Sequence, residues 1–148
     1  MKDRADEAAD PFGPEDVPTQ RRDARERTIE VFYEAEMKGI TAAEVVEEMT
    51  LEPDPLVVEL IAGIETHQTE LDEHISVSLD PSWSLARVSV LDRLVMRLGT
   101  YELIHRPKVP TAAALNEAVE LAKLWSGPEA GRFVNGVLSS VAKSVRES

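Results

Sequence analysis

The amino-acid sequence predicts an all-α fold of six to seven helices joined by short loops, forming a single domain over residues 20–148. Apolar residues recur at helical spacing along most of the chain, and no stretch alternates apolar and polar residues as a half-buried strand does. Prolines and glycines separate these periodic stretches into segments of ordinary helix length. With 43% apolar residues in 148 positions, the chain can bury one core.

The N-terminal part divides into a tail and two helices. Residues 1–19 contain three prolines and many acidic residues, which predicts a disordered tail. Residues 20–38 contain no proline or glycine, and Gly39 follows as a plausible end of a helix. Thr41 with Glu44 three residues later predicts a capping box at the start of a short second helix, which ends before Pro53.

The remaining helices follow from apolar spacing. Residues 56–79 keep the helical period, with a break near residues 66–68. The next helix is predicted over residues 87–105, and another covers residues 115–125. After Gly127 and Pro128, apolar residues from 134 to 141 predict the last helix.

Composition excludes several classes of protein. The absence of cysteine excludes disulfides, thiolate metal sites and cysteine nucleophiles. No long apolar stretch or signal-peptide core is present, so we expect a cytoplasmic protein that does not enter membranes. The sequence has no glycine-rich phosphate loop and no nucleophile elbow. We therefore expect no enzyme and no cofactor.

The charge is distributed unevenly. The net charge is −12, yet residues 41–80 contain eleven acidic residues and no lysine or arginine, while residues 81–148 are net basic. This pattern predicts one acidic and one basic face. The net charge alone therefore does not exclude binding to nucleic acid.

Four arginines lie close together at the start of the first predicted helix: Arg21, Arg22, Arg25 and Arg27. Residues 21, 22 and 25 share one face of a helix, so they could grip phosphates. The alternative is a solvated helix end in which these arginines pair with nearby acidic residues.

Two further features have structural and functional interpretations. His67 and His74 share a predicted helix face with Glu70 between them, but solvent-facing histidines are far commoner than metal ligands, so we expect no metal. His105 near a helix C-terminus is explained by the helix dipole. Gly136 lies inside a helical pattern, which favours a close helix crossing at that position.

Several strings resemble the NusB family of transcription antitermination factors. They are LNEAVELAK at residues 115–123, RFVNGVLSSVA at 132–142, VLDRLVMRLGTYEL at 90–103 and the arginine-rich RRDARERTIEVFYEAEM at 21–37. The resemblance implies two packed three-helix subbundles and no catalysis. It also implies binding to the single-stranded boxA element of ribosomal RNA leader transcripts, as a heterodimer with the small-subunit ribosomal protein NusE, to help elongating RNA polymerase pass terminators.

The resemblance also implies site residues by position. The implied RNA-binding residues are Arg21, Arg22, Arg25, Trp125, Glu129, Arg132 and Phe133. Bases would stack on the aromatic side chains, although an aromatic residue at helical spacing is often a core residue. The implied NusE-binding residues are Tyr33, Met37, Asp92 and Glu102, where acidic groups suit a basic partner.

Two departures from the family pattern bear on affinity. Asp23 interrupts the arginine run, and residues 126–131 form a predicted loop with Pro128 and two glycines. Our hypothesis is therefore that RNA is bound usefully only when NusE is present.

Two alternatives remain open at this stage. One is a helical interaction module without RNA binding of its own. The other is a detached NusB-like domain of a ribosomal RNA cytosine methyltransferase system, in which catalysis would need another polypeptide. The sequence also leaves open whether the free protein is a monomer or a homodimer.

Overall fold

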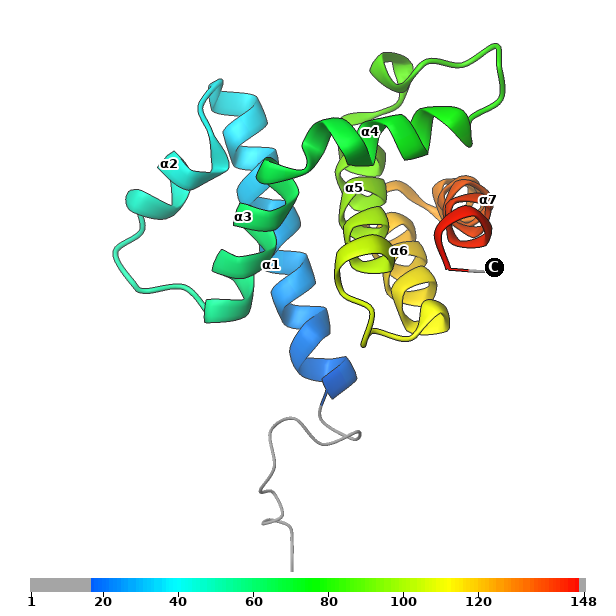
Figure 1. The fold of residues 1–148 in the computed structure, drawn as a ribbon. Coiled ribbons are helices and arrows are strands. Elements are labelled where there is room, and N and C mark those ends of the chain that lie inside the picture. Colours follow the sequence, from blue (N-terminus) through cyan, green and yellow to red (C-terminus); the bar gives the residue numbers. More distant parts are fainter. Residues whose placement is uncertain (1–16, 147–148) are drawn as a thin grey trace, which may run out of the picture.

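The computed structural model describes residues 17–146, and these residues form seven α-helices, one 3₁₀ turn and no strand (Figure 1). The helices are α1 (Val17–Lys38), α2 (Ala42–Glu47), α3 (Pro55–Thr66), α4 (Gln68–Val77), α5 (Val90–His105), α6 (Thr111–Ser126) and α7 (Pro128–Val145), with η1 (Leu85–Arg87) before α5. The predicted all-α fold is confirmed.

The first helix begins earlier than the sequence predicts. α1 starts at Val17, so residues 17–19 are helical and the predicted boundary at residue 20 is wrong. Pro18 lies in the first turn, where a missing N–H costs no helical hydrogen bond. The rest of the predicted disordered tail, residues 1–16, lies outside the described part of the chain.

Local signals set the boundaries of α2, α3 and α4. The Thr41 hydroxyl accepts a hydrogen bond from the Glu44 N–H, and the Glu44 carboxylate accepts one from the Thr41 N–H, so the capping box is confirmed. Pro55 opens α3 after Asp54, whose carboxylate accepts a hydrogen bond from the Leu56 N–H at 2.7 Å. The predicted break lies at His67, the single residue between α3 and α4.

Helix α5 is the central element. It packs against α1 and α3 on one side and against α4, α6 and α7 on the other (Figure 1). α1, α2 and α3 contact one another, as do α5, α6 and α7, and α4 joins the second group by packing on α5 and α7. One continuous apolar core runs through both groups. The structure thus has the two implied groups, with α4 added to the second.

Close helix contacts occur at glycines other than the expected one. A Cβ on Gly99 of α5 would lie 2.7 Å from Cδ1 of Leu138 on α7. Gly136 is exposed, and a Cβ there would meet nothing within 4 Å, so the expected crossing at Gly136 is wrong.

The predicted loop at residues 126–131 is also wrong, because Gly127 alone joins α6 to α7 with φ +95° and Pro128 already begins α7.

Acidic side chains from residues 41–80 pair with basic side chains of α5. Arg97 donates two hydrogen bonds to Asp72 of α4, at 2.7 and 3.0 Å. Arg106, which follows α5, pairs with Glu59 of α3. The uneven charge distribution therefore helps to hold α3 and α4 against α5. Among the described residues, no helix has the length and apolar character needed to cross a membrane.

Candidate nucleic-acid interface

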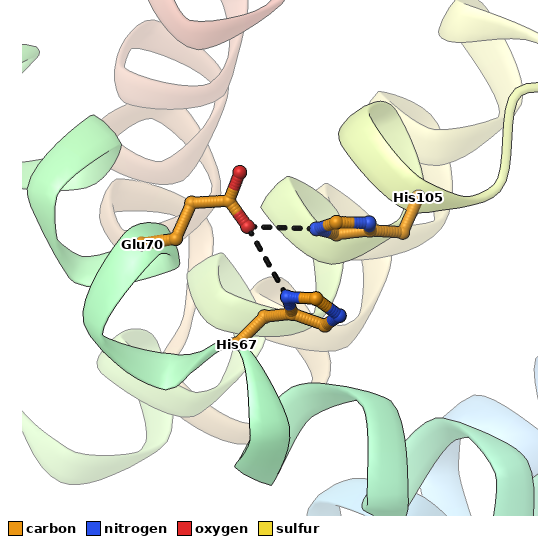
Figure 2. A group of neighbouring side chains, drawn as sticks. All are labelled: His67, Glu70 and His105. Carbon is orange, nitrogen blue, oxygen red and sulfur yellow. Dashed lines mark hydrogen bonds and ion pairs between the residues drawn. The ribbon is translucent and has the colours of Figure 1, made fainter.

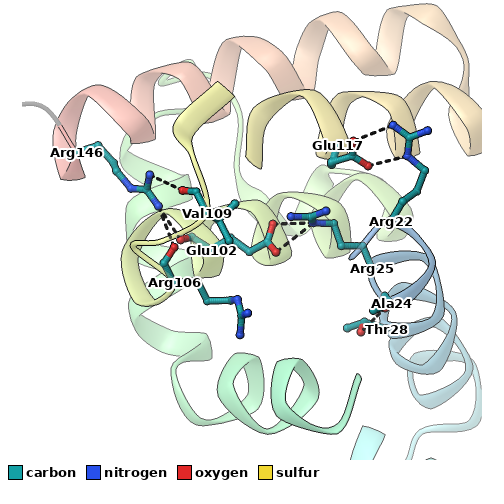
Figure 3. Close-up of polar contacts among 9 residues, drawn as sticks. All are labelled: Arg22, Ala24, Arg25, Thr28, Glu102, Arg106, Val109, Glu117 and Arg146. Carbon is teal, nitrogen blue, oxygen red and sulfur yellow. Dashed lines mark hydrogen bonds and ion pairs between the residues drawn. The ribbon is translucent and has the colours of Figure 1, made fainter. Parts of the chain in front are cut away.

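Arg22 lies at the surface and is held over α6. Its Nε and Nη2 atoms each donate a hydrogen bond of 2.8 Å to the Glu117 carboxylate (Figure 3). This contact lowers the pKa of the Glu117 carboxyl and raises the pKa of the Arg22 guanidinium. The Arg22 side chain is still 55% exposed, so an anion in solution can reach it.

Arg25 and Glu102 both lie in the interior, which differs from the surface roles implied for them. The Arg25 Nε atom donates to both carboxylate oxygens of Glu102, at 2.9 and 3.1 Å (Figure 3). Both residues are 2% exposed, because this face of α1 packs on α5. Neither side chain can touch RNA or a partner protein while this ion pair is intact.

Arg21 lies beside Arg25 and Arg106. Burial, followed by the nearby charges of Arg106 and Arg25, lowers the pKa of the half-buried Arg21 guanidinium. Arg146 holds the C-terminal end of α5, because its Nη2 atom donates to the backbone carbonyls of Glu102 and Arg106 at 3.0 and 3.2 Å (Figure 3). Several arginines therefore gather at the start of α1, but Arg22, Arg25 and Arg106 are each paired with a glutamate. Arg106 was not among the residues selected from the sequence.

The second implied group lies where α6 meets α7. Trp125 and Phe133 are partly buried and pack against the core, whereas Glu129 and Arg132 are exposed on the first two turns of α7. Trp83, from the segment before α5, is 52% exposed, and its ring centroid lies 6.4 Å from that of Phe133. The aromatic side chains available at this junction are thus Trp83 beside Phe133, together with Trp125, which is partly buried like Phe133. A tryptophan in a short polar turn was the available signal for Trp83, and the sequence analysis missed it.

Three of the four implied partner residues are at least partly accessible. Tyr33 and Met37 lie one turn apart on α1 and are 40% and 56% exposed. Asp92 is half-buried in the first turn of α5, and burial raises the pKa of its carboxyl. Glu102 is buried, as described above. The surface available to a partner is therefore two apolar side chains on α1 and one carboxyl on α5.

Three candidate metal ligands lie where the junction of α3 and α4 meets the end of α5. His67, Glu70 and His105 bring one ligand atom each to within 4.8 Å of one another (Figure 2). His74, which the sequence analysis considered, is not part of this group. His105 takes its place, because the end of α5 packs beside the junction of α3 and α4.

The all-α arrangement of helices is that of the NusB class of proteins, as a solved structure of T. maritima NusB shows. That solved structure has a TM-score of 0.75 and 35% sequence identity, and the match covers 83% of this chain and 90% of that one. The NusB family model matches residues 22–143. The chain belongs to the NusB family.

Other members carry the functional descriptions. The transcription antitermination protein NusB of Bacillus subtilis (strain 168) is 36% identical over 131 residues, which cover 87% of this chain and 99% of that protein. A structure of antitermination factors NusB and NusE in complex with dsRNA has a TM-score of 0.72 and 30% identity, covering 84% of this chain and 96% of that one. The family consists of RNA-binding transcription factors and not of enzymes.

Proposed function

We propose that this chain binds boxA-type single-stranded RNA of ribosomal RNA leader transcripts together with NusE, and that the complex acts on elongating RNA polymerase to prevent termination. The observation that carries the proposal is family membership over residues 22–143, combined with a solved relative in complex with NusE and dsRNA. The single-stranded form of the RNA is part of the proposal. These partners would make the protein cytoplasmic.

The surface at the start of α1 supports phosphate binding. Burial, and then the nearby charges of Arg106 and Arg25, lower the pKa of the Arg21 guanidinium, so a bound anion would stabilise its charged form. Glu59 and Glu102 compensate part of the positive charge around it. Arg22 adds an exposed guanidinium next to this group. Arg132, Phe133 and Trp83 supply the second half of the surface, where each stacked base would contribute about 1–3 kcal/mol.

The exposed face of α1 supports docking of NusE. Tyr33 and Met37 offer apolar contact area, and Asp92 offers negative charge to a basic ribosomal protein. The RNA and NusE surfaces would then both lie on α1, so that bound NusE could extend the RNA-binding surface.

The proposal is tested by fluorescence anisotropy with a short boxA-type RNA, titrated with and without NusE at two salt concentrations. The test variant is Arg21→Glu with Arg22→Glu, and Arg25 is left unchanged because it is buried. The matched control is Arg27→Glu, since Arg27 is exposed on the same helix and pairs with Glu30. We expect the double variant to lose RNA binding, and the control variant to keep it within about twofold.

Further arms separate the alternatives. A duplex of the same sequence decides whether the RNA is bound as a single strand. If the protein binds NusE but binds no RNA in any of these conditions, the result favours the interaction module without RNA binding of its own. The pairing of Arg22 and Arg25 with glutamates is the observation that supports this alternative. Light scattering of the free protein decides between monomer and homodimer. RNA binding that survives the double charge reversal would refute the assignment of Arg21 and Arg22.

A further inference from the structure

His67, Glu70 and His105 meet where three helix ends come together. His67 is the only residue between α3 and α4, Glu70 lies in the first turn of α4, and His105 is the last residue of α5 (Figure 2). The chain contains three histidines and no cysteine, so the fold brings two of its three imidazoles to one point.

The separations of the ligand atoms suit a metal ion. The Glu70 Oε1 atom lies 2.7 Å from Nε2 of His105 and 3.5 Å from Nδ1 of His67, and no pair in the group is farther apart than 4.8 Å. A tetrahedral ion about 2.0–2.2 Å from each ligand needs separations of about 3.3 Å. These side chains are 26–41% exposed, so they have room to rotate until the three ligand atoms face one ion.

The two imidazoles are held by neighbouring packing. Their ring centroids lie 3.9 Å apart, and the Tyr101 ring stacks on His105 with a centroid distance of 5.3 Å. Tyr101 in turn packs on Gly63 of α3, where a Cβ would overlap the tyrosine ring. This contact fixes the spacing of α3 and α5 at the point where the two histidines face each other. An imidazole nitrogen binds a metal in the plane of its own ring, so a shared ion would require the two rings to turn out of this stack.

The charges around the group favour a cation. Glu70 supplies a carboxylate, and His105 stands at the C-terminus of α5, where the helix dipole is negative. The adjacent Arg106 is paired with Glu59, which compensates its positive charge. Two imidazoles and one carboxylate select ions such as Zn²⁺, Ni²⁺ and Cu²⁺ over Mg²⁺ and Ca²⁺, which prefer oxygen ligands.

We propose that His67, Glu70 and His105 form a binding site for one first-row divalent transition-metal ion, which ties the junction of α3 and α4 to the end of α5. Three protein ligands leave at least one coordination position for water. Bound metal stabilises the folded protein, because the unfolded chain does not hold these residues together. This inference is independent of the proposed RNA function.

The experiment uses the full chain without a purification tag, stripped with chelator and titrated calorimetrically with Zn²⁺. We expect one equivalent to bind and to raise the melting temperature. The variants His67→Gln and His105→Gln should each weaken binding about tenfold or more, and Glu70→Gln should also weaken it. His74→Gln is the matched control, since it removes the remaining histidine and should leave the affinity unchanged.

Two outcomes would overturn the proposal. One is the absence of saturable Zn²⁺ binding at one equivalent. The other is equal binding of Mg²⁺ that survives both histidine substitutions, which would mean only counter-ions on the acidic surface. Broadening of histidine proton resonances by paramagnetic Co²⁺ can be measured on the natural protein. It therefore tests the site even if the substituted proteins do not fold. It should reach the ring protons of His67 and His105 before those of His74, and the reverse order would also refute the site.

Discussion

Replacing Arg25 with methionine should destabilise the protein by about 3–5 kcal/mol, because it would leave the Glu102 carboxylate buried without its partner. A loss of this size is expected when one partner of a buried ion pair is removed. Both side chains are 2–3% exposed, and two hydrogen bonds of 2.9 and 3.1 Å join them. An exposed pair would contribute only about 0–1 kcal/mol. A typical domain has about 5–15 kcal/mol of stability in total, so the loss would be severe.

The double variant Arg25→Met with Glu102→Met separates burial of a charge from loss of packing. It removes both charges and keeps roughly the same volume, so its stability should lie within about 1 kcal/mol of the natural protein. Urea unfolding followed by helical circular dichroism measures Arg25→Met, Glu102→Met and the double variant, provided that the slope of free energy against urea stays constant. The coupling energy from this cycle is then at least about 2 kcal/mol.

Two results would refute this reasoning. The first is a cost below about 1 kcal/mol for Arg25→Met, which would be expected of a solvated pair. The second is a double variant that loses the sum of both single effects, which would mean that the two side chains do not interact. The folded double variant also tests the RNA role implied for Arg25. We expect it to bind RNA as the natural protein does, because Arg25 is buried.

Three further predictions concern single contacts. The hydrogen bond from Arg22 lowers the pKa of Glu117, so the stability of this pair is fully present above the ordinary pKa of glutamate and is lost as pH falls through it towards the lowered value. The difference in urea midpoint between the natural protein and Arg22→Met should therefore shrink from about pH 6 to about pH 3. Gly63→Ala should destabilise the protein by about 1–2 kcal/mol, because the added methyl group would overlap the Tyr101 ring. Gly136→Ala should stabilise it by about 0.5–1 kcal/mol, because the site is open and alanine favours the helix. A shift of the urea midpoint in the same direction for both variants would contradict the packing described. Thr41→Ala should cost about 1 kcal/mol in the same assay, and no change would mean that the capping box does not stabilise α2.

The helices could be predicted because their signals are local. The cap at Thr41, the proline that opens α3 and the break before α4 each depend on a few neighbouring residues. The errors in the predicted helix boundaries arose at residues that are common in two different structures. Pro18 fits a disordered tail as well as a first helical turn, and Gly127 with Pro128 fits a loop as well as a direct junction of two helices. The local sequence is the same for both uses, so it does not distinguish them.

The site could be predicted only in part, because sequence spacing identifies a shared face but not what the face contacts. Arg22 and Arg25 lie on nearly the same face of α1, yet Arg22 is exposed and Arg25 is buried against α5. His67 and His105 lie far apart in the sequence, so no spacing rule could join them. The missed residues Trp83 and Arg106 likewise acquire their neighbours from other helices.

The placement of charge explains why a protein of net charge −12 offers little positive charge to RNA. The arginines of α5 are committed to acidic partners, since Arg93 pairs with Glu36 and Arg97 with Asp72. These pairs hold the helices together, so their positive charge is not available to phosphates. At the start of α1, Arg22 and Arg25 are paired in the same way, and exposed basic side chains such as Arg87, Lys108 and Arg132 do not offset a net charge of −12. A basic partner docked on the exposed face of α1 would add the missing charge next to that surface, which is the physical reason to expect that RNA binding depends on NusE.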